Sequence, residues 1–327
     1  MSAADVSTGT TTTGTTTTGT TTTGTTTTGT TTTGTTTTGT TTTGTGRATA
    51  RPASHRLLST RLLRSELRLI AGRRRNQAGL AVLAAVPVVM AIAVKMSTPR
   101  AGEGPDFLSS ITSNGLFVPL AALGVEMGMF LPLAMSMLAG DAIAGEANIG
   151  TLRYLLAVPV GRTRLLLVKY VSLCIGAFWG IAAVALPGAV VGIAIFGTGP
   201  LTTLSGSQIS FGAAVWRLLL VMLYLSAGLA ALAAVGLFIS TLTEQPIAAA
   251  IALMIFTIVS WILDSVPQLA WLHPWLVVDH WLAFGDLLRD PIGGSGEITR
   301  GLALAAAYAV VFWTAAWARF AGKDITS

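Results

Sequence analysis

Charged residues, cysteines and histidines are all scarce in this sequence of 327 residues. Asp, Glu, Lys and Arg make up only 10% of it, whereas soluble domains carry about 25%. The single cysteine, Cys174, excludes an intrachain disulfide and makes a structural zinc site improbable on composition. The three histidines, His55, His273 and His280, are too scattered along the chain to predict a ligand cluster. We therefore expect no bound metal.

Motifs for catalysis and nucleotide binding are also missing. The sequence contains no GxxxxGK[ST] phosphate-binding loop, no HExxH zinc motif and no GxSxG nucleophile motif. We therefore expect that the chain is not an enzyme, that it does not hydrolyse ATP by itself and that it binds no cofactor.

Apolar residues make up 52% of the sequence, and the mean hydropathy is +0.69. About 20 apolar residues suffice for a helix to cross a bilayer. Six runs approach or exceed that length, at 79–94, 116–139, 166–196, 213–240, 247–263 and 302–320. We predict an all-α integral membrane protein with six transmembrane helices.

Lys and Arg are distributed asymmetrically around these runs. Nine precede the first run, four lie between the second run and the first turn of the third, and two lie at the end of the sixth run or just after it. Together they are 15 of the 20. Because cytoplasmic loops are enriched in bases, both termini are predicted to be cytoplasmic. The net charge of +6 then reflects membrane topology and not nucleic-acid binding. The Ala-, Gly- and Arg-rich composition favours a bacterial plasma membrane.

The residues before the first run have two different compositions. Residues 1–50 are mostly Thr and Gly with glycines every five residues, which fits neither helix nor strand and predicts a disordered tail. Residues 51–77 predict a basic amphipathic helix in the membrane interface; alternatively, their arginines only fix the topology. The predicted apolar stripe contains Leu58, Leu62, Leu69 and Ile70, with Leu63 and Leu67 beside them. Residues 78–327 form the predicted six-span domain.

Two further features lie in or near the membrane. Glu126 falls inside the second run, where a carboxylate costs about 2.5 to 3.5 kcal/mol unless it is protonated or paired. We expect either that Glu126 and Met127 face a translocation cavity or that Glu126 forms a polar contact between helices. Residues 264–300 contain three tryptophans and several prolines, and predict two short helices re-entering the outer leaflet, or a loop lying on the headgroups.

The segment between the second and third runs is polar and rich in turn residues. Asp141 and Glu146 follow the second run, Gly150 breaks the helix, and Thr151 can cap a short helix that ends at Pro159. A helix of two turns is not stable alone in water. We therefore expect this helix to dock on a partner.

This segment resembles the ABC-2-type transporter permeases. The resemblance is carried by the pattern E-x-x-x-G-T-L-x-x-L-L-x-x-P-V-x-R, followed by a Lys that opens the next run, and by the ending F-x-x-K-D at residues 320–324. The residues that it assigns to coupling with an ATPase are Asp141, Glu146, Gly150, Thr151, Leu152, Arg153, Leu155, Leu156, Pro159, Arg162, Arg164 and Lys169.

The resemblance implies the membrane subunit of an ABC exporter. In such transporters the short helix sits in a groove of a separate ATP-binding subunit, and the N-terminal helix, here with Arg61, Arg64, Glu66 and Arg68, lies beside it. It also implies two ATPase copies, which bind ATP and Mg²⁺, and a second permease chain. The alternative is an ATP-independent secondary transporter or channel that uses Glu126.

Overall fold

The computed structural model describes residues 60–97, 114–150, 161–290, 292 and 296–322. The chain divides into two units, Met1–His55 and Arg56–Ser327, and all described residues belong to the second. The predicted tail at 1–50 and the predicted short helix within 151–160 lie outside the described residues.

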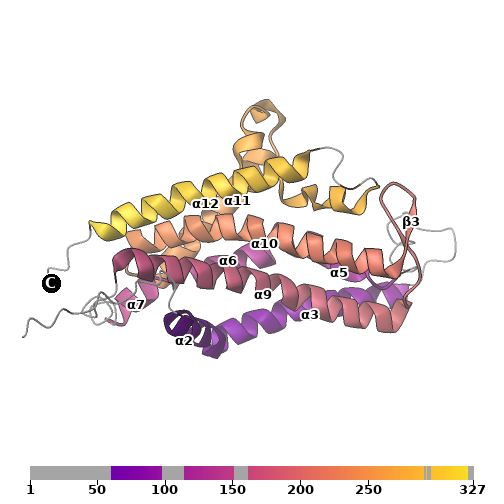
Figure 1. Ribbon diagram of the computed structural model, residues 1–327, viewed down its shortest axis with the longest axis horizontal. Coiled ribbons are helices and arrows are strands. Elements are labelled where there is room, and N and C mark those ends of the chain that lie inside the picture. The colour runs from indigo at the N-terminus through magenta and orange to yellow at the C-terminus, as the bar shows by residue number, and fades with distance from the viewer. Residues whose placement is uncertain (1–59, 98–113, 151–160, 291, 293–295, 323–327) are drawn as a thin grey trace, which may run out of the picture. The chain divides into compact units, whose positions relative to one another are not determined.

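Long apolar helices dominate the described part of the chain (Figure 1). Five are long and apolar enough to cross a membrane, and a bent pair brings the number to six if that pair makes one span. The five are α3 (Arg74–Ser97), α9 (Arg162–Phe196), α10 (Phe211–Leu242), α11 (Pro246–Asp264) and α12 (Glu297–Ala321). The prediction of an all-α protein is confirmed, and the six predicted spans correspond to five or six helices that could cross a membrane.

The bent pair is α5 (Phe117–Gly128) and α6 (Phe130–Gly140), which meet at an angle of 58°. The sequence predicted one uninterrupted run here. The break has a local cause, because Pro132 has no N–H to bond the carbonyl of Gly128 and its ring crowds that carbonyl. The ladder restarts at the next residue, where the Leu133 N–H donates to the Met129 carbonyl over 2.9 Å.

Small residues set the distance between neighbouring helices. A Cβ added to Gly188 of α9 would lie 3.1 Å from both Pro119 of α5 and Pro87 of α3. In α10, a Cβ on Gly236 would lie 2.5 Å from Ala139 of α6. Such close approach is typical of membrane helices, which gain stability from packing because lipid gives no hydrophobic drive for association.

Both ends of the helix bundle carry connecting structure. At one end, the α7 end, α7 (Ala144–Asn148) follows α6, and the last turn of α12 meets the first turn of α9 through an Arg162 bond to the Ala321 carbonyl of 2.7 Å. At the other, the η6 end, β2 (Leu201–Thr202) pairs antiparallel with β3 (Gln208–Ile209) between α9 and α10. This small hairpin is an addition to the predicted all-α fold.

Residues 264–290 coil at the η6 end as three short 3-10 helices, and not as the two short helices that we predicted. They are η4 (Pro267–Leu269), η5 (His273–Trp275) and η6 (Trp281–Leu288). Prolines in the first turns of η4 and η5 keep these pieces short. Trp271 and Trp275 are 72% and 69% exposed, whereas Trp281 is buried. Re-entry into the outer leaflet stays a prediction.

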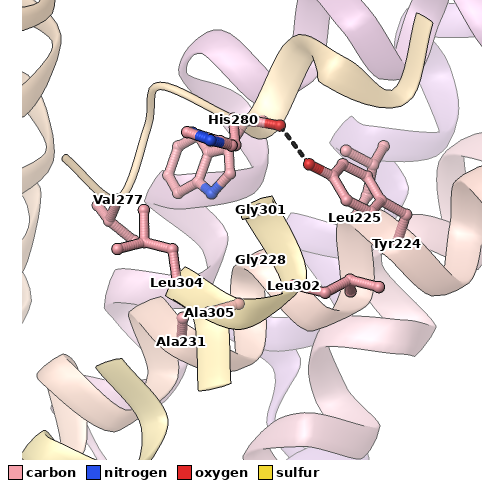
Figure 2. A pocket seen from close by; sticks show the side chains of 11 residues that line it. Tyr224, Leu225, Gly228, Ala231, Val277, His280, Gly301, Leu302, Leu304 and Ala305 are labelled. Carbon is pink, nitrogen blue, oxygen red and sulfur yellow. Dashed lines mark hydrogen bonds between the residues drawn. The ribbon is translucent and has the colours of Figure 1, made fainter. Parts of the chain in front are cut away.

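The segment before η6 is fixed to the bundle by packing and one buried hydrogen bond. Figure 2 shows the Tyr224 hydroxyl of α10 donating to the carbonyl of His280, over 2.6 Å. Gly228 of α10 and Gly301 of α12 make room for this contact, because a Cβ on either would meet Trp281 or His280 within 3.0 Å. The cavity that remains there is only about 10 Å³, which is at the lower limit for one water.

The helix α2 (Thr60–Gly72) confirms a helix within the predicted amphipathic segment, but with a different buried face. Leu62, Leu63, Leu67 and Ile70 are partly buried, while Leu69 is 48% exposed; Leu58 lies outside the described residues. The side of α2 that packs on the other helices is centred on Leu62, Glu66 and Ile70, which are four residues apart, and Leu69 lies beside it. An acidic residue therefore lies on the inward side of α2.

Candidate functional site

Six charged side chains gather at the α7 end, where α2, α3, α6, α7 and α9 come together. Three are acids and three are bases, so the group is neutral when all are ionised. The members of this α7-end cluster are Glu66, Arg73, Arg75, Asp141, Glu146 and Lys169.

Lys169 is the centre of the more deeply buried half of the cluster. Its Nζ lies 2.6 Å from Oε1 of Glu146 on α7 and 3.4 Å from Oε1 of Glu66 on α2. The side chain of Lys169 is only 3% exposed, and both carboxylates are 12% exposed. Burial makes an unpaired charge expensive, so each partner depends on the others. The ammonium group of α9 thereby joins α2 to α7.

Asp141, directly after α6, forms the more exposed half. Its Oδ2 accepts from both Arg73, which stands between α2 and α3, and Arg75 in α3. The arginine side chains are 32% and 44% exposed, so each contact is worth less than the buried lysine pairs.

Ser240 near the end of α10 holds the turn that presents Asp141 and Glu146. Its hydroxyl accepts from the N–H groups of Ile143 and Ala144, over 3.1 and 2.9 Å, and donates to the Gly140 carbonyl over 3.0 Å. These bonds satisfy backbone groups at the start of α7 and the end of α6, where no helical partner exists. The sequence analysis did not identify Ser240.

The cluster lines a cavity of about 20 Å³, which offers room for about one water molecule. Burial raises the pKa of Glu146 above its ordinary value, and the positive charge of Lys169 opposes that shift. The arrangement can hold opposite charges at fixed positions, and it can exchange a proton with one water molecule. It contains no nucleophile paired with a base.

A larger cavity, of about 460 Å³, lies between α2, α3, α6 and α9. Its lining is mostly apolar, and Arg75, Asn76 and Gln77 add polar groups. Met135 and Met137 line it from α6. Glu126 and Met127, the residues that the sequence assigned to a cavity, do not line this one.

Glu126 and Met127 are both fully buried at the end of α5. Neither carboxylate oxygen of Glu126 has a hydrogen-bond partner among the residues that the structure describes. A packed polar contact between helices would have supplied one, so this geometry does not support that alternative within the described part of the chain.

The structure brings four of the sequence-predicted residues together: Glu66, Asp141, Glu146 and Lys169. Arg61, Arg64 and Arg68 are exposed on α2. Gly150 has the positive φ of 70° expected of a helix-ending glycine. Arg164 is partly buried. The predicted coupling residues Thr151, Leu152, Arg153, Leu155, Leu156 and Pro159 lie outside the described residues.

Arg73 and Arg75 are the functional candidates that the sequence analysis missed. They belong to the Arg73–Arg75 triplet at the end of the predicted amphipathic segment 51–77, whose arginines were interpreted as the polar face of an interfacial helix or as a topology signal. The available signal was the acid Asp141 at the end of the second run, since an acid and a base at the same membrane surface on adjacent spans are within reach of each other.

The histidines also depart from the sequence-based expectation. His273 lies with Asp264 and Asp279 in a group whose ligand atoms are all within 4.8 Å of one another. The sequence analysis did not predict this group of one histidine and two aspartates, because tight turns bring the three distant positions together.

The helices and their hydropathy define a multi-pass membrane protein. A family model described as a protein of unknown function, DUF2705, matches residues 88–326. The chain therefore belongs to the DUF2705 family. No curated protein matches it. The family description names no substrate and no partner, so the resemblance to ABC-2-type permeases stays a hypothesis.

Proposed function

We propose that this chain is the permease subunit of an ATP-driven ABC exporter in a bacterial plasma membrane, with both termini in the cytoplasm. Two permease chains would assemble with two copies of a separate ATP-binding subunit, which would bind ATP and Mg²⁺. The chain itself would catalyse no reaction.

The observation that carries this proposal is the α7-end cluster at the base of the loop between α7 and α9. That loop contains the Gly-Thr-Leu pattern that resembles a coupling helix. It leaves α7 at Gly150 and re-enters helix after Gly161, the N-cap of α9. Glu146 and Lys169 therefore flank it on both sides and bond to each other.

A partner that pushes on this loop would move several helices together. The Glu146–Lys169 contact closes the loop, the Glu66–Lys169 contact adds α2, and Ser240 adds α10. Because separating buried charges is costly, displacement of the loop is passed to these helices as a rigid-body motion. That is the property a coupling element needs.

The double substitution Leu155→Asp and Leu156→Asp tests the docking of the loop. We expect membrane insertion to persist and co-purification with the ATP-binding subunit, or ATP-coupled transport, to be lost, because the apolar contact is replaced by two charges. The matched control is Leu204→Asp, an exposed leucine at the η6 end. Coupled transport at the wild-type rate in the double variant would contradict the proposal.

A second candidate function is ATP-independent transport that uses Glu126 as a proton or cation site. It is favoured by the complete burial of Glu126 and by the lack of hydrogen-bond partners for its carboxylate among the described residues. Transport in reconstituted vesicles that needs a proton gradient but no ATP, and that Glu126→Gln abolishes, would replace the first proposal with this one.

A further inference from the structure

Three potential metal ligands converge at the η6 end, far from the α7-end cluster in the fold. Asp264 is the last residue of α11, His273 opens η5, and Asp279 precedes η6. One oxygen or nitrogen of each lies within 4.8 Å of those of the other two, and all three residues are partly buried. We name these residues the η6-end cluster.

A series of tight turns produces this convergence. The N–H groups of Leu269, Leu272 and Leu276 each bond the carbonyl three residues earlier, over 2.9, 2.7 and 2.9 Å. The chain therefore coils back toward the end of α11, and residues that are 9 and 15 positions beyond Asp264 return to its side chain.

The imidazole of His273 is prepared as a ligand. Its Nε2 lies 3.2 Å from the carbonyl of Val266. A carbonyl only accepts, so Nε2 carries a proton, and the imidazole can then offer only Nδ1 to a metal. Histidines that bind metals commonly fix their tautomer through such a bond from the second nitrogen to a backbone carbonyl.

The two carboxylates lie next to each other, and burial together with the neighbouring Asp264 raises the pKa of Asp279. Asp264 stands at the C-terminal end of α11, where the helix dipole favours cations, and its Oδ1 is buried without a hydrogen-bond partner among the described residues. Asp279 approaches His280, with 2.6 Å between Oδ2 and Nδ1. Nδ1 of His280 has no hydrogen-bond partner among the described residues, so this contact is not a hydrogen bond.

We propose that Asp264, His273 and Asp279 bind a divalent transition-metal cation of the Zn²⁺ class. Zn²⁺ accepts both imidazole nitrogen and carboxylate oxygen as ligands, and three protein ligands leave the fourth position to water. Two ionised carboxylates also balance the charge of one dication. Ca²⁺ and Mg²⁺ prefer all-oxygen sites, so the imidazole selects against them.

Binding of one zinc ion would require the distances between the ligand atoms to shorten only slightly. Ligand atoms about 2.0 to 2.2 Å from a tetrahedral zinc are roughly 3.4 Å from each other, so separations of up to 4.8 Å must shorten by less than the reach of one rotamer change. Bound metal would clip η5 and the residues before η6 to the end of α11.

The test is direct metal binding by the full chain. The protein is purified in lipid nanodiscs with a tag that contains no histidine, stripped with a chelator, and titrated with Zn²⁺ by calorimetry, while bound metal is counted by elemental mass spectrometry. We expect one equivalent per chain. Asp264→Asn, His273→Gln and Asp279→Asn should each weaken binding by about tenfold or more.

Glu244→Gln is the matched control for the aspartate variants, because it removes a carboxylate outside the cluster and should leave binding unchanged. Equal affinity in the cluster variants and the control would show adventitious binding and overturn the proposal. Displacement of Zn²⁺ by equimolar Ca²⁺ or Mg²⁺ would overturn the metal class.

If a cluster variant fails to fold, a measurement on the wild-type chain still tests the proposal. Co²⁺ in a site of one imidazole and two carboxylates gives a visible absorption band that Zn²⁺ should remove at one equivalent. Absence of a saturable band in the folded wild-type chain would also overturn the proposal.

Discussion

The two polar clusters, at opposite ends of the bundle, differ in how the charges of their members are balanced. The α7-end cluster has three acids and three bases and neutralises itself. The η6-end cluster has two acids and one histidine and lacks a matching cation among its own members. The first therefore braces the helices by itself, while the second would be completed by the dication that we propose.

They also differ in how the chain assembles them. Lys169 and Glu66 are 103 residues apart, and Arg73 and Asp141 are 68 apart, so the α7-end cluster exists only when several helices have packed. The η6-end cluster is drawn from 16 consecutive residues coiled by local turns. Loss of helix packing should therefore destroy the first cluster before the second.

The largest expected effect comes from Lys169→Met. It leaves Glu66 and Glu146 buried without their shared cation, which should lower the free energy of unfolding by about 3 to 5 kcal/mol. Unfolding in mixed micelles of increasing denaturing detergent measures it. Lys95→Met, at an exposed position near the end of α3, is the control and should stay within about 0.5 kcal/mol of wild type. A loss below 1 kcal/mol for Lys169→Met would show that the pairs do not brace the bundle.

Zinc should stabilise the chain through the η6-end cluster alone. At a free concentration 100 times the dissociation constant, it should raise the free energy of unfolding by about 2.7 kcal/mol in the wild type and in Lys95→Met. Asp264→Asn should lose this response. The same variant without metal should be as stable as wild type or slightly more so, because it removes one of two neighbouring negative charges. A stabilisation by zinc that survives Asp264→Asn would place the effect elsewhere.

Arginine substitutions test the exposed half of the α7-end cluster. Arg73→Gln should cost about 1 kcal/mol or less, because Arg75 still pairs with Asp141 and both arginines are partly solvated. The double variant with Arg75→Gln should cost more than the sum of the single variants, since it leaves Asp141 without a cation. Strict additivity in a double-mutant cycle would mean that the two arginines act independently.

The smallest effect is the pH dependence due to Glu146. Its folded pKa is raised, so the folded state holds a proton that the unfolded state, with an ordinary pKa of 4.5, releases first. Stability should therefore fall as pH rises from about 4.5 through the raised value, and Glu146→Gln should remove that part of the slope. Thermal midpoints of both chains across this range measure the difference, and identical slopes would contradict the assignment.

Composition was enough to predict the membrane helices, because an apolar run of about 20 residues has few alternatives. It could not predict the bend between α5 and α6, where Pro132 acts on a carbonyl four residues earlier inside an otherwise uniform run. Periodicity predicted α2 but not which of its residues pack on the other helices, so Glu66 was not recognised as a partner of Lys169.

The sequence could identify only those site residues whose charge, beside or inside a membrane span, is conspicuous without knowledge of a partner. Glu146 and Lys169 were singled out by their position beside membrane spans, and Glu126 by its position inside one. Their partners could not be identified, since a contact over 103 residues depends on helix packing that no local pattern records. The η6-end cluster was missed because irregular 3-10 turns have no sequence period that would predict which side chains meet.

The contact between the last turn of α12 and the first turn of α9 offers a position for a fluorescent label beside the start of α9. Arg162 binds the Ala321 carbonyl, and Trp317 donates to Thr163 over 2.8 Å. A fluorophore on a cysteine introduced at Gly322, after Cys174→Ala, would therefore sit beside the first turn of α9. If the cytoplasmic partner that we propose binds next to this turn, its arrival would change the emission in real time, without any label on the partner.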